Sequence, residues 1–194
     1  MNFLAHVYLS GSNIPLAIGN LIADRVKGKK INLLTPEIQA GVLLHREIDY
    51  FTDHHTIFRE CVTKLFPKYR HYSRVIIDMY FDHFLALNWS SFHEIPLNEF
   101  SNNFYKELEI KSPKFTKDIQ GFINALIKYN WFEYYESLSG LYEILNQMEK
   151  HTKFPSNLSA SIEELNLNYE YFQAHFFQFM KEIIEFTKIK IKDL

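Results

Sequence analysis

The sequence predicts an all-α protein in which residues 1–194 form a single helical domain of the bundle type. Its apolar residues recur at helical spacing, with no convincing series of alternating strands and no repeat of fixed period. Hydrophobic residues make up 47% of the chain and aromatic residues 16%, which is ample for a packed core. Glycine and proline are scarce, at six residues each, so disorder is not expected away from the ends.

Helices are predicted for most of the first 90 residues. Asn2, His6 and Ser10 lie four apart, which suits a helix with one polar face, although this run is also short enough for a strand. Thr35 and Pro36 form a typical helix start, with a hydroxyl N-cap before a proline in the first turn. We expect helices over residues 1–10, 14–26, 36 to about 52–55, 56–66 and 75–89, with Pro67 ending the fourth.

The second half is expected to complete the bundle with helices between residues 97 and 190. Helical spacing covers residues 97–108, 112–130, 132–150 with an interruption at Ser139–Gly140, and 159–188. The last of these carries an aromatic stripe from Tyr169 to Phe186, which predicts a buried helix face; a groove for a hydrophobic partner is the alternative. Seven of the nine histidines precede residue 94, so the polar chemistry is expected mainly in residues 1–90.

The composition disfavours several classes of protein. A formal net charge of −2 argues against a chain whose main task is to coat nucleic acid. Cys61 is the single cysteine, so no intramolecular disulfide can form and a reducing setting is expected. The start lacks the features of a signal peptide, and no stretch approaches the roughly 20 apolar residues of a membrane span. We therefore expect a cytoplasmic protein without a nucleic-acid or membrane partner; no oligomeric state is predicted.

The segment from Gly41 to Asp53 carries the most informative pattern. His45, Asp49 and Asp53 follow one another at steps of four, so an α-helix places them on one face. Imidazoles and carboxylates that converge from several helices form metal sites in helical bundles. The other predicted helices of the first half offer further such groups at His6, Asp24, Asp78, Asp82 and His83. The pattern indicates a divalent cation, which acidifies a bound water and stabilises charge on a phosphoryl group.

An ion-pair network is the alternative interpretation of the same residues. Asp49 and Asp53 repel each other on one helix face, as do Asp78 and Asp82 on another. Such pairs require a compensating charge, and arginine or plain water meets that need as well as a metal does. The available arginines include Arg46, Arg59 and Arg74. The spacing alone leaves the metal site and the ion-pair network equally open.

Covalent and nucleotide-loop chemistry are disfavoured. Cys61 has no adjacent base, and the sequence contains neither a Gly-x-Ser-x-Gly elbow nor a glycine-rich phosphate loop. Basic residues flank the proposed site in the sequence, where they could receive a phosphate or an acidic protein, or form a solvated surface. They are Lys27, Lys29, Lys30, Lys68, Arg70 and Arg74.

Five motifs within the first 90 residues occur together in an order and spacing that are specific as a set. They are Met1–His6, Gly19–Asp24, Gly41–Asp49, Thr52–Asp53 and Asp78–Ala86. Together they resemble the acyl carrier protein phosphodiesterase family, also called acyl carrier protein hydrolase. The resemblance implies a helical fold related to the HD-type metal-dependent phosphohydrolases. It also implies a hydrolase that uses a metal-activated water, with manganese as the suggested metal, to remove 4'-phosphopantetheine from holo acyl carrier protein.

The resemblance also implies roles for individual residues. Asp24, in the second motif, is the strongest catalytic candidate; His83 is a ligand or an acid–base group, and Arg46 stabilises the phosphate or pairs with a carboxylate. The candidate metal ligands are His6, Asp24, His45, Asp49, Asp78 and Asp82. Carrier proteins are acidic, so basic residues are expected to dock the substrate. These are Lys27, Lys29, Lys30, Arg70 and Arg74.

Two features depart from the expected patterns. The chain has Asp82-His83 instead of the His-Asp order of ordinary HD proteins, so ligands cannot be transferred from that signature. Arg25 stands where an apolar residue is expected after the Ala-Asp of the second motif. Two other functions stay open: a phosphohydrolase of the same fold that acts on a nucleotide or small phosphoester, and a helical module that binds carrier protein without chemistry.

Overall fold

The structure, a computed structural model, describes residues 1–194 and is all-helical, as predicted. The α-helices are α1 (Phe3–Tyr8), α2 (Ile14–Ile22), α3 (Pro36–His54), α4 (Thr56–Tyr69), α5 (Ser73–Leu87), α6 (Leu97–Lys111), α7 (Lys117–Lys128), α8 (Trp131–Tyr134), α9 (Leu138–Glu149), α10 (Ser161–Leu167) and α11 (Tyr169–Asp193). Short 3-10 helices are η1 (Ala23–Arg25), η2 (Gly28–Leu33), η3 (Arg70–Tyr72), η4 (Trp89–Ser91) and η5 (Ser112–Lys114). No helix is long and apolar enough to cross a membrane.

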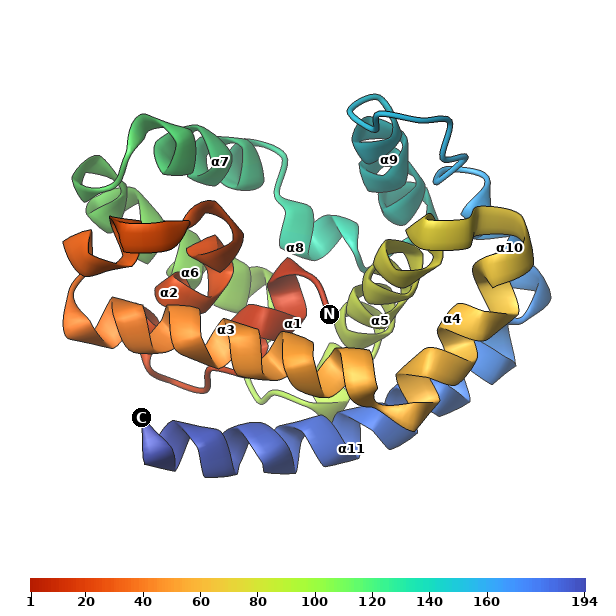
Figure 1. Cartoon of the computed structure of the whole chain (residues 1–194), viewed down its shortest axis with the longest axis horizontal. Coiled ribbons are helices and arrows are strands. Elements are labelled where there is room, and N and C mark those ends of the chain that lie inside the picture. Colours follow the sequence, from red (N-terminus) through yellow and green to blue (C-terminus); the bar gives the residue numbers. More distant parts are fainter.

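One cluster of 50 buried apolar residues forms the core. The short helix α1 lies in the middle of the molecule beside α5, with α11 along one side and α7, α8 and α9 on the opposite side (Figure 1). The predicted burial of the aromatic stripe is confirmed, because Phe172, Phe176 and Phe179 of α11 are fully buried. Phe81 of α5 packs against this row, with ring centroids 5.7 Å from Phe176 and 5.4 Å from Phe179.

Helices α2 and α3 touch backbone to backbone at two glycines. A Cβ atom on Gly19 would lie 2.0 Å from the carbonyl oxygen of Ile38, and one on Gly41 would lie 2.1 Å from that of Leu16. No side chain fits in this space, so only glycine allows the crossing. His45 follows Gly41 by one helical turn, and Asn20 follows Gly19 directly. The close crossing therefore brings these two polar residues together.

Asp82 of α5 holds the first turn of α1. Its Oδ1 accepts a hydrogen bond from the backbone N–H of Asn2 at 3.0 Å, and its Oδ2 accepts from those of Leu4 at 2.9 Å and Ala5 at 3.4 Å. The first N–H groups of a helix have no partner within the helix, so a fully buried carboxylate satisfies them and complements the helix dipole. This contact sets the position of His6 one turn further along α1.

Helix α4 continues through Pro67, so the predicted stop at this residue is wrong. This proline lacks the N–H that would bond the preceding turn and its ring crowds the carbonyl there, but only two helical residues follow it, so little of the helix is affected. The helix instead ends at Tyr69, where Arg70 takes a φ of 51°. At α3, Thr35 occupies the predicted N-cap position, but its side chain makes no capping hydrogen bond.

The interruption expected at Ser139–Gly140 is also wrong, because both residues lie in the first turn of α9. The break falls before it, at Ser137, whose hydroxyl accepts the N–H of Gly140 at 3.0 Å and caps the helix. A Cβ atom on Gly140 would lie 2.1 Å from the carbonyl oxygen of Tyr134. This glycine therefore permits close packing of α9 on α8 and does not mark a helix end.

Two long predicted helices are each divided by a side-chain contact to the backbone. The amide of Gln120 donates to the carbonyl oxygen of Phe115 at 2.7 Å, which stabilises the turn between η5 and α7. The amide of Asn168 donates to the carbonyl oxygen of Glu164 at 3.0 Å and ends α10 before α11 begins. Such local bonds compete with helix continuation, and helical spacing does not reveal them.

Candidate metal centre and cleft

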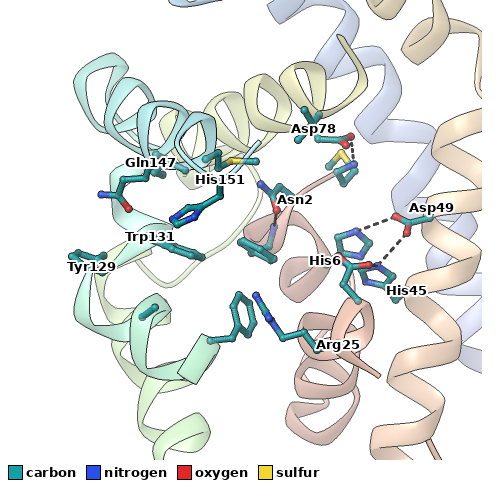
Figure 2. Close-up of a pocket in the computed structure, with 18 of the residues that line it drawn as sticks. Asn2, His6, Arg25, His45, Asp49, Asp78, Tyr129, Trp131, Gln147 and His151 are labelled. Atoms are coloured by element: carbon teal, nitrogen blue, oxygen red, sulfur yellow. Dashed lines mark hydrogen bonds and ion pairs between the residues drawn. The ribbon is translucent and has the colours of Figure 1, made fainter. Parts of the chain in front are cut away.

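His6, His45 and Asp49 bring three ligand atoms within 4.8 Å of one another. The Nε2 atom of His6 lies 3.4 Å from Oδ1 of Asp49, and that of His45 lies 3.1 Å from Oδ2 (Figure 2). The Oδ1 atom of Asp24 lies 3.4 Å from Nε2 of His45. Helix α1 supplies one of these groups, η1 another and α3 the remaining two. The structure thus brings three of the six sequence-predicted ligands to one position, and Asp24 adjoins them through its contact with His45.

Asn20 orients both imidazoles. Its amide nitrogen donates to the carbonyl oxygen of His6 at 2.8 Å and lies 2.9 Å from the hydroxyl of Ser10, so its Oδ1 atom faces the rings. The Nδ1–H of His6 donates to that Oδ1 at 2.7 Å. The Nδ1–H of His45 donates to the backbone carbonyl of Asn20 at 2.8 Å. Since these oxygens only accept, both Nδ1 atoms carry the proton, and each neutral ring presents the lone pair of Nε2.

The charges of this group are strongly coupled. Burial alone would lower the pKa of His45, but hydrogen bonds to Asp24 and Asp49 outweigh it and raise that pKa to about 9. Burial and the neighbouring charge of His45 lower the pKa of His6 to about 4. Burial opposes ionisation of Asp49, yet bonds from both histidines hold its pKa below the usual range. Without a metal, the His45 imidazolium therefore balances the carboxylates.

These residues fit a divalent cation. Two imidazole nitrogens with stacked rings, 4.0 Å between centroids, and the carboxylate of Asp49 form a mixed nitrogen and oxygen ligand set, which Asp24 adjoins. Both histidines are buried and oriented by Asn20, whereas the side chains of Asp49 and Asp24 are 48% and 76% exposed and open to solvent. A cation bound here would replace the Nε2 proton of the His45 imidazolium. The cation, instead of the imidazolium, would then balance the charge of the carboxylates.

The cluster opens into a cleft of about 780 Å³ with two unlike walls. The wall around the cluster is polar and comes from the first 80 residues. The opposite wall is largely apolar and comes from α7, α8 and α9; it carries Phe122, Ala125, Tyr129, Trp131, Ile144, Gln147 and Met148, with Lys150 and His151 at its end. Figure 2 shows Trp131, Gln147 and His151 across the cleft from His6, His45 and Asp49.

Asp78 also lines the cleft but lies apart from the four clustered ligands. Its Oδ1 atom accepts a hydrogen bond from the Met1 amino group at 2.5 Å. Burial raises the pKa of the Asp78 carboxyl, and the Met1 ammonium opposes this rise. In this arrangement Asp78 balances the Met1 charge at the edge of the polar wall.

Three predicted site residues lie outside the cleft. Asp82 is fully buried and bonded to the backbone of α1, and burial raises its pKa to about 7 despite the Met1 ammonium and these N–H groups. The buried His83 donates from Nδ1 to the carbonyl oxygen of Tyr135 at 2.7 Å. Arg46 is exposed on α3 and does not line the cleft. None of the three is in place to reach a group held by the cluster.

The predicted docking residues form two separate surfaces. Lys27, Lys29 and Lys30 are exposed around η2, directly after Asp24 in the chain. Arg70 and Arg74 are exposed at the junction of α4 and α5. The guanidinium of Arg74 pairs with Asp53. Asp53, the third residue of the polar stripe His45, Asp49 and Asp53, is therefore bound to α5 instead of to the cluster.

Sequence reasoning missed Asn20 and the apolar wall. Asn20 lies inside the second motif, four residues before Asp24 and directly after Gly19, so its position offered a signal. The residues of the apolar wall offered no such signal. In the sequence Phe122, Trp131 and Met148 resemble ordinary core residues, and only the fold turns them toward the cluster.

Comparison with known proteins identifies the family of the chain. The model of a family described as acyl carrier protein phosphodiesterase matches residues 1–183. Over 191 residues the chain is 29% identical to the acyl carrier protein phosphodiesterase of Photorhabdus laumondii, a match that covers 95% of this chain and 94% of that protein. It is 27% identical to that of Serratia proteamaculans over 98% of this chain and 99% of the relative. No solved structure matches. With the family model spanning nearly the whole chain, the protein belongs to the acyl carrier protein phosphodiesterase family.

Proposed function

We propose that this protein hydrolyses the phosphodiester that joins 4'-phosphopantetheine to a serine of acyl carrier protein. The observation that carries the proposal is the paired orientation of His6 and His45 by Asn20, which aims two Nε2 lone pairs at the position shared with Asp49. Family membership supplies the substrate class. The products are apo carrier protein and free 4'-phosphopantetheine.

In this proposal His6, His45, Asp49 and Asp24 hold a divalent metal ion, with Mn²⁺ as the proposed identity. The bound ion supplies positive charge for the phosphoryl oxygens and lowers the pKa of a water molecule. Asn20 accepts both Nδ1–H groups, so each ring in its neutral form offers the lone pair of Nε2 to the ion, which takes the place of the Nε2 proton of His45. The relatedness to HD-type phosphohydrolases stays a prediction.

Asp24 is the proposed catalytic carboxylate. It is the most exposed of the four clustered side chains and borders the cleft. The hydrogen bond from His45 lowers the pKa of Asp24, so the side chain is ionised near neutral pH. An ionised carboxylate at this position can accept a proton from the attacking water or hold that water in line with the phosphorus atom.

The exposed lysines Lys27, Lys29 and Lys30 are the proposed docking contacts. Lys27 precedes η2, and Lys29 and Lys30 lie within it, a few residues after Asp24 in the chain. An acidic carrier protein is attracted to such a basic surface. Arg70 and Arg74 are a more distant contact, and Arg74 is already paired with Asp53. Docking at η2 would bring the serine of the carrier to the mouth of the cleft.

The test is to incubate the protein with holo acyl carrier protein and Mn²⁺ and to follow the mass of the carrier. The expected result is loss of the 4'-phosphopantetheine mass, which stops when EDTA removes the metal. Asp24→Ala is expected to stay folded and lose the activity.

Turnover of a small phosphoester with no change in the carrier would favour the alternative phosphohydrolase. Binding of carrier without metal or turnover would favour the non-catalytic module.

A further inference from the structure

The apolar wall of the cleft has no role in holding a metal or a phosphoryl group. A cleft of about 780 Å³ is far larger than a phosphodiester and its cation require. Clefts of about 300–1,000 Å³ with mostly apolar linings and a few polar groups are typical of sites that enclose a whole small molecule. The wall therefore points to a second part of the substrate, beyond the bond that is broken.

Three aromatic rings lie where the two walls meet: Phe3 of α1, and Phe122 and Trp131 of the apolar wall. The ring centroids of Phe3 lie 5.1 Å from Phe122 and 5.6 Å from Trp131, and those of Phe122 and Trp131 are 6.1 Å apart. The guanidinium of Arg25 lies 4.4 Å from the centroid of Phe122, and its Nη1 is 3.3 Å from Asp118. These contacts join η1 to α7 and hold the aromatic group beside the metal ligands.

The wall also carries polar side chains. Gln147 lies in the last turn of α9 next to Met148, and Lys150 and His151 lie just beyond that helix. Figure 2 places Gln147 and His151 on the side of the cleft opposite to the cluster. Across from the metal ligands, the lining thus combines aromatic and aliphatic side chains with the amide of Gln147, the imidazole of His151 and the ammonium of Lys150.

We propose that this wall is the subsite for the pantetheine arm, so that the arm lies inside the cleft along α7, α8 and α9 while the carrier protein stays at its mouth. The inference rests on the proposed function and assigns its substrate arm to named residues. The chemical groups agree: next to the phosphate the arm carries a branched dimethyl segment, which suits the aromatic group held beside the metal ligands. Two amides follow, and these suit hydrogen bonding to Gln147 and His151.

The test uses pantetheine, which lacks the phosphate, and inorganic phosphate as separate probes of the two ends. The chain has two tryptophans, and the other, Trp89, is buried with its Nε1–H bonded to the carbonyl oxygen of Ile95. Pantetheine is expected to change the tryptophan fluorescence of the native protein and of Trp89→Phe but not of Trp131→Phe. Inorganic phosphate is expected to leave Trp131 emission unchanged.

Ala125→Leu adds bulk to the wall, and Asn124→Leu, one position away on an exposed face of the same helix, is the matched control. Ala125→Leu is expected to weaken pantetheine binding at least tenfold. The same substitution should lower kcat/KM for holo carrier protein by the same factor relative to kcat/KM for methyl p-nitrophenyl phosphate. Asn124→Leu should change neither quantity, and the metal content of both variants should equal that of the native protein.

Two failures are distinguishable. The first failure is a native protein that hydrolyses holo carrier protein but whose tryptophan fluorescence does not change with pantetheine. If its Ala125→Leu variant also keeps the native ratio of the two kcat/KM values, the subsite is overturned and the proposed function stays intact. A native protein that never removes the prosthetic group refutes the proposed function, and the pantetheine titration then decides the subsite alone. Binding of adenosine monophosphate at Trp131 with at least tenfold higher affinity than pantetheine also overturns the inference.

Discussion

The Nδ1 atom of His45 donates to the backbone carbonyl oxygen of Asn20 at 2.8 Å, across the crossing of α2 and α3 that Gly19 and Gly41 permit. Through its side chain the same asparagine accepts the Nδ1–H of His6 at 2.7 Å. One residue that is itself no metal ligand thus orients two candidate ligands from different helices. Residues in this position commonly control metal affinity as strongly as some ligands do.

Asn20→Ala is expected to reduce metal affinity about 10–100-fold, because His6 loses the acceptor that orients its ring. Isothermal titration with Mn²⁺ measures the effect. Asn13→Ala is the matched control on the same helix: Asn13 accepts the N–H of Leu16 as the N-cap of α2. It should cost about 1 kcal/mol of stability and leave the metal affinity unchanged. Equal metal affinity in both variants would contradict the role of Asn20.

His45→Ala is expected to abolish stoichiometric metal binding, since it removes the nitrogen between Asp24 and Asp49. His54→Ala is its control on α3, because His54 is exposed and its contacts are local, to the backbone carbonyl and the ring of Tyr50. Metal analysis of the purified proteins compares the two. Full metal content in a folded His45→Ala protein would remove this residue from the centre.

Gly41→Ala is expected to destabilise the protein by about 3 kcal/mol or more, because its Cβ would lie 2.1 Å from the carbonyl oxygen of Leu16. Gly121→Ala in α7 meets no atom within 4 Å and should stabilise the fold by about 0.5–1 kcal/mol. Urea unfolding of both variants measures the difference. Gly41→Ala should also lower metal affinity, since a wider crossing moves His45 away from Asn20. A loss of stability no larger than 0.5 kcal/mol would show that the crossing adapts.

Asp82→Ala is expected to lower the free energy of unfolding by about 2 kcal/mol, because three N–H groups at the start of α1 lose their acceptor. The folded variant should still bind one equivalent of whatever metal the native protein binds. Chemical denaturation and metal analysis separate these effects. Loss of metal without loss of stability would restore Asp82 as a ligand, as the motif resemblance implied.

Replacement of Lys27, Lys29 and Lys30 by glutamate is expected to raise the KM for holo carrier protein about tenfold at low salt, with little effect at high salt. The same replacement of Lys106, Lys181 and Lys192, which are exposed and outside the cleft, is the charge-matched control. Steady-state kinetics at two ionic strengths measures both. An identical rise in the two triple variants would indicate a general charge effect and no docking surface at η2.

The fold class and most helix positions could be predicted from the sequence because they depend on local spacing. The steps of four from Asn2 to Ser10 and from His45 to Asp53 both fall on helices or at their ends. The errors arose where Gln120 and Asn168 bond the backbone and divide a helix, and where a proline or glycine has a meaning that depends on its surroundings. Pro67 lies in a last turn that tolerates it, and Gly140 serves a packing contact.

The candidate site was predictable in part for the same reason. His45 and Asp49 share a helix face, so their proximity follows from helix geometry alone. Asp78 and Asp82 have the same spacing, yet Asp82 turns to the backbone of α1 and Asp78 to the Met1 amino group. Spacing shows that two side chains are neighbours on a helix; it does not show which other element they face.

By itself the sequence determined the helical class, the polar stripe of α3 and the resemblance that matches the family. Only the tertiary structure decided that Asn20 orients both histidines, that Asp53 is paired with Arg74, and that Trp131 faces the cluster across a cleft. The physical reason is the range of the interactions. Helix formation and side-chain spacing are local, whereas a metal centre and its cleft form where residues distant in the chain converge as the core packs.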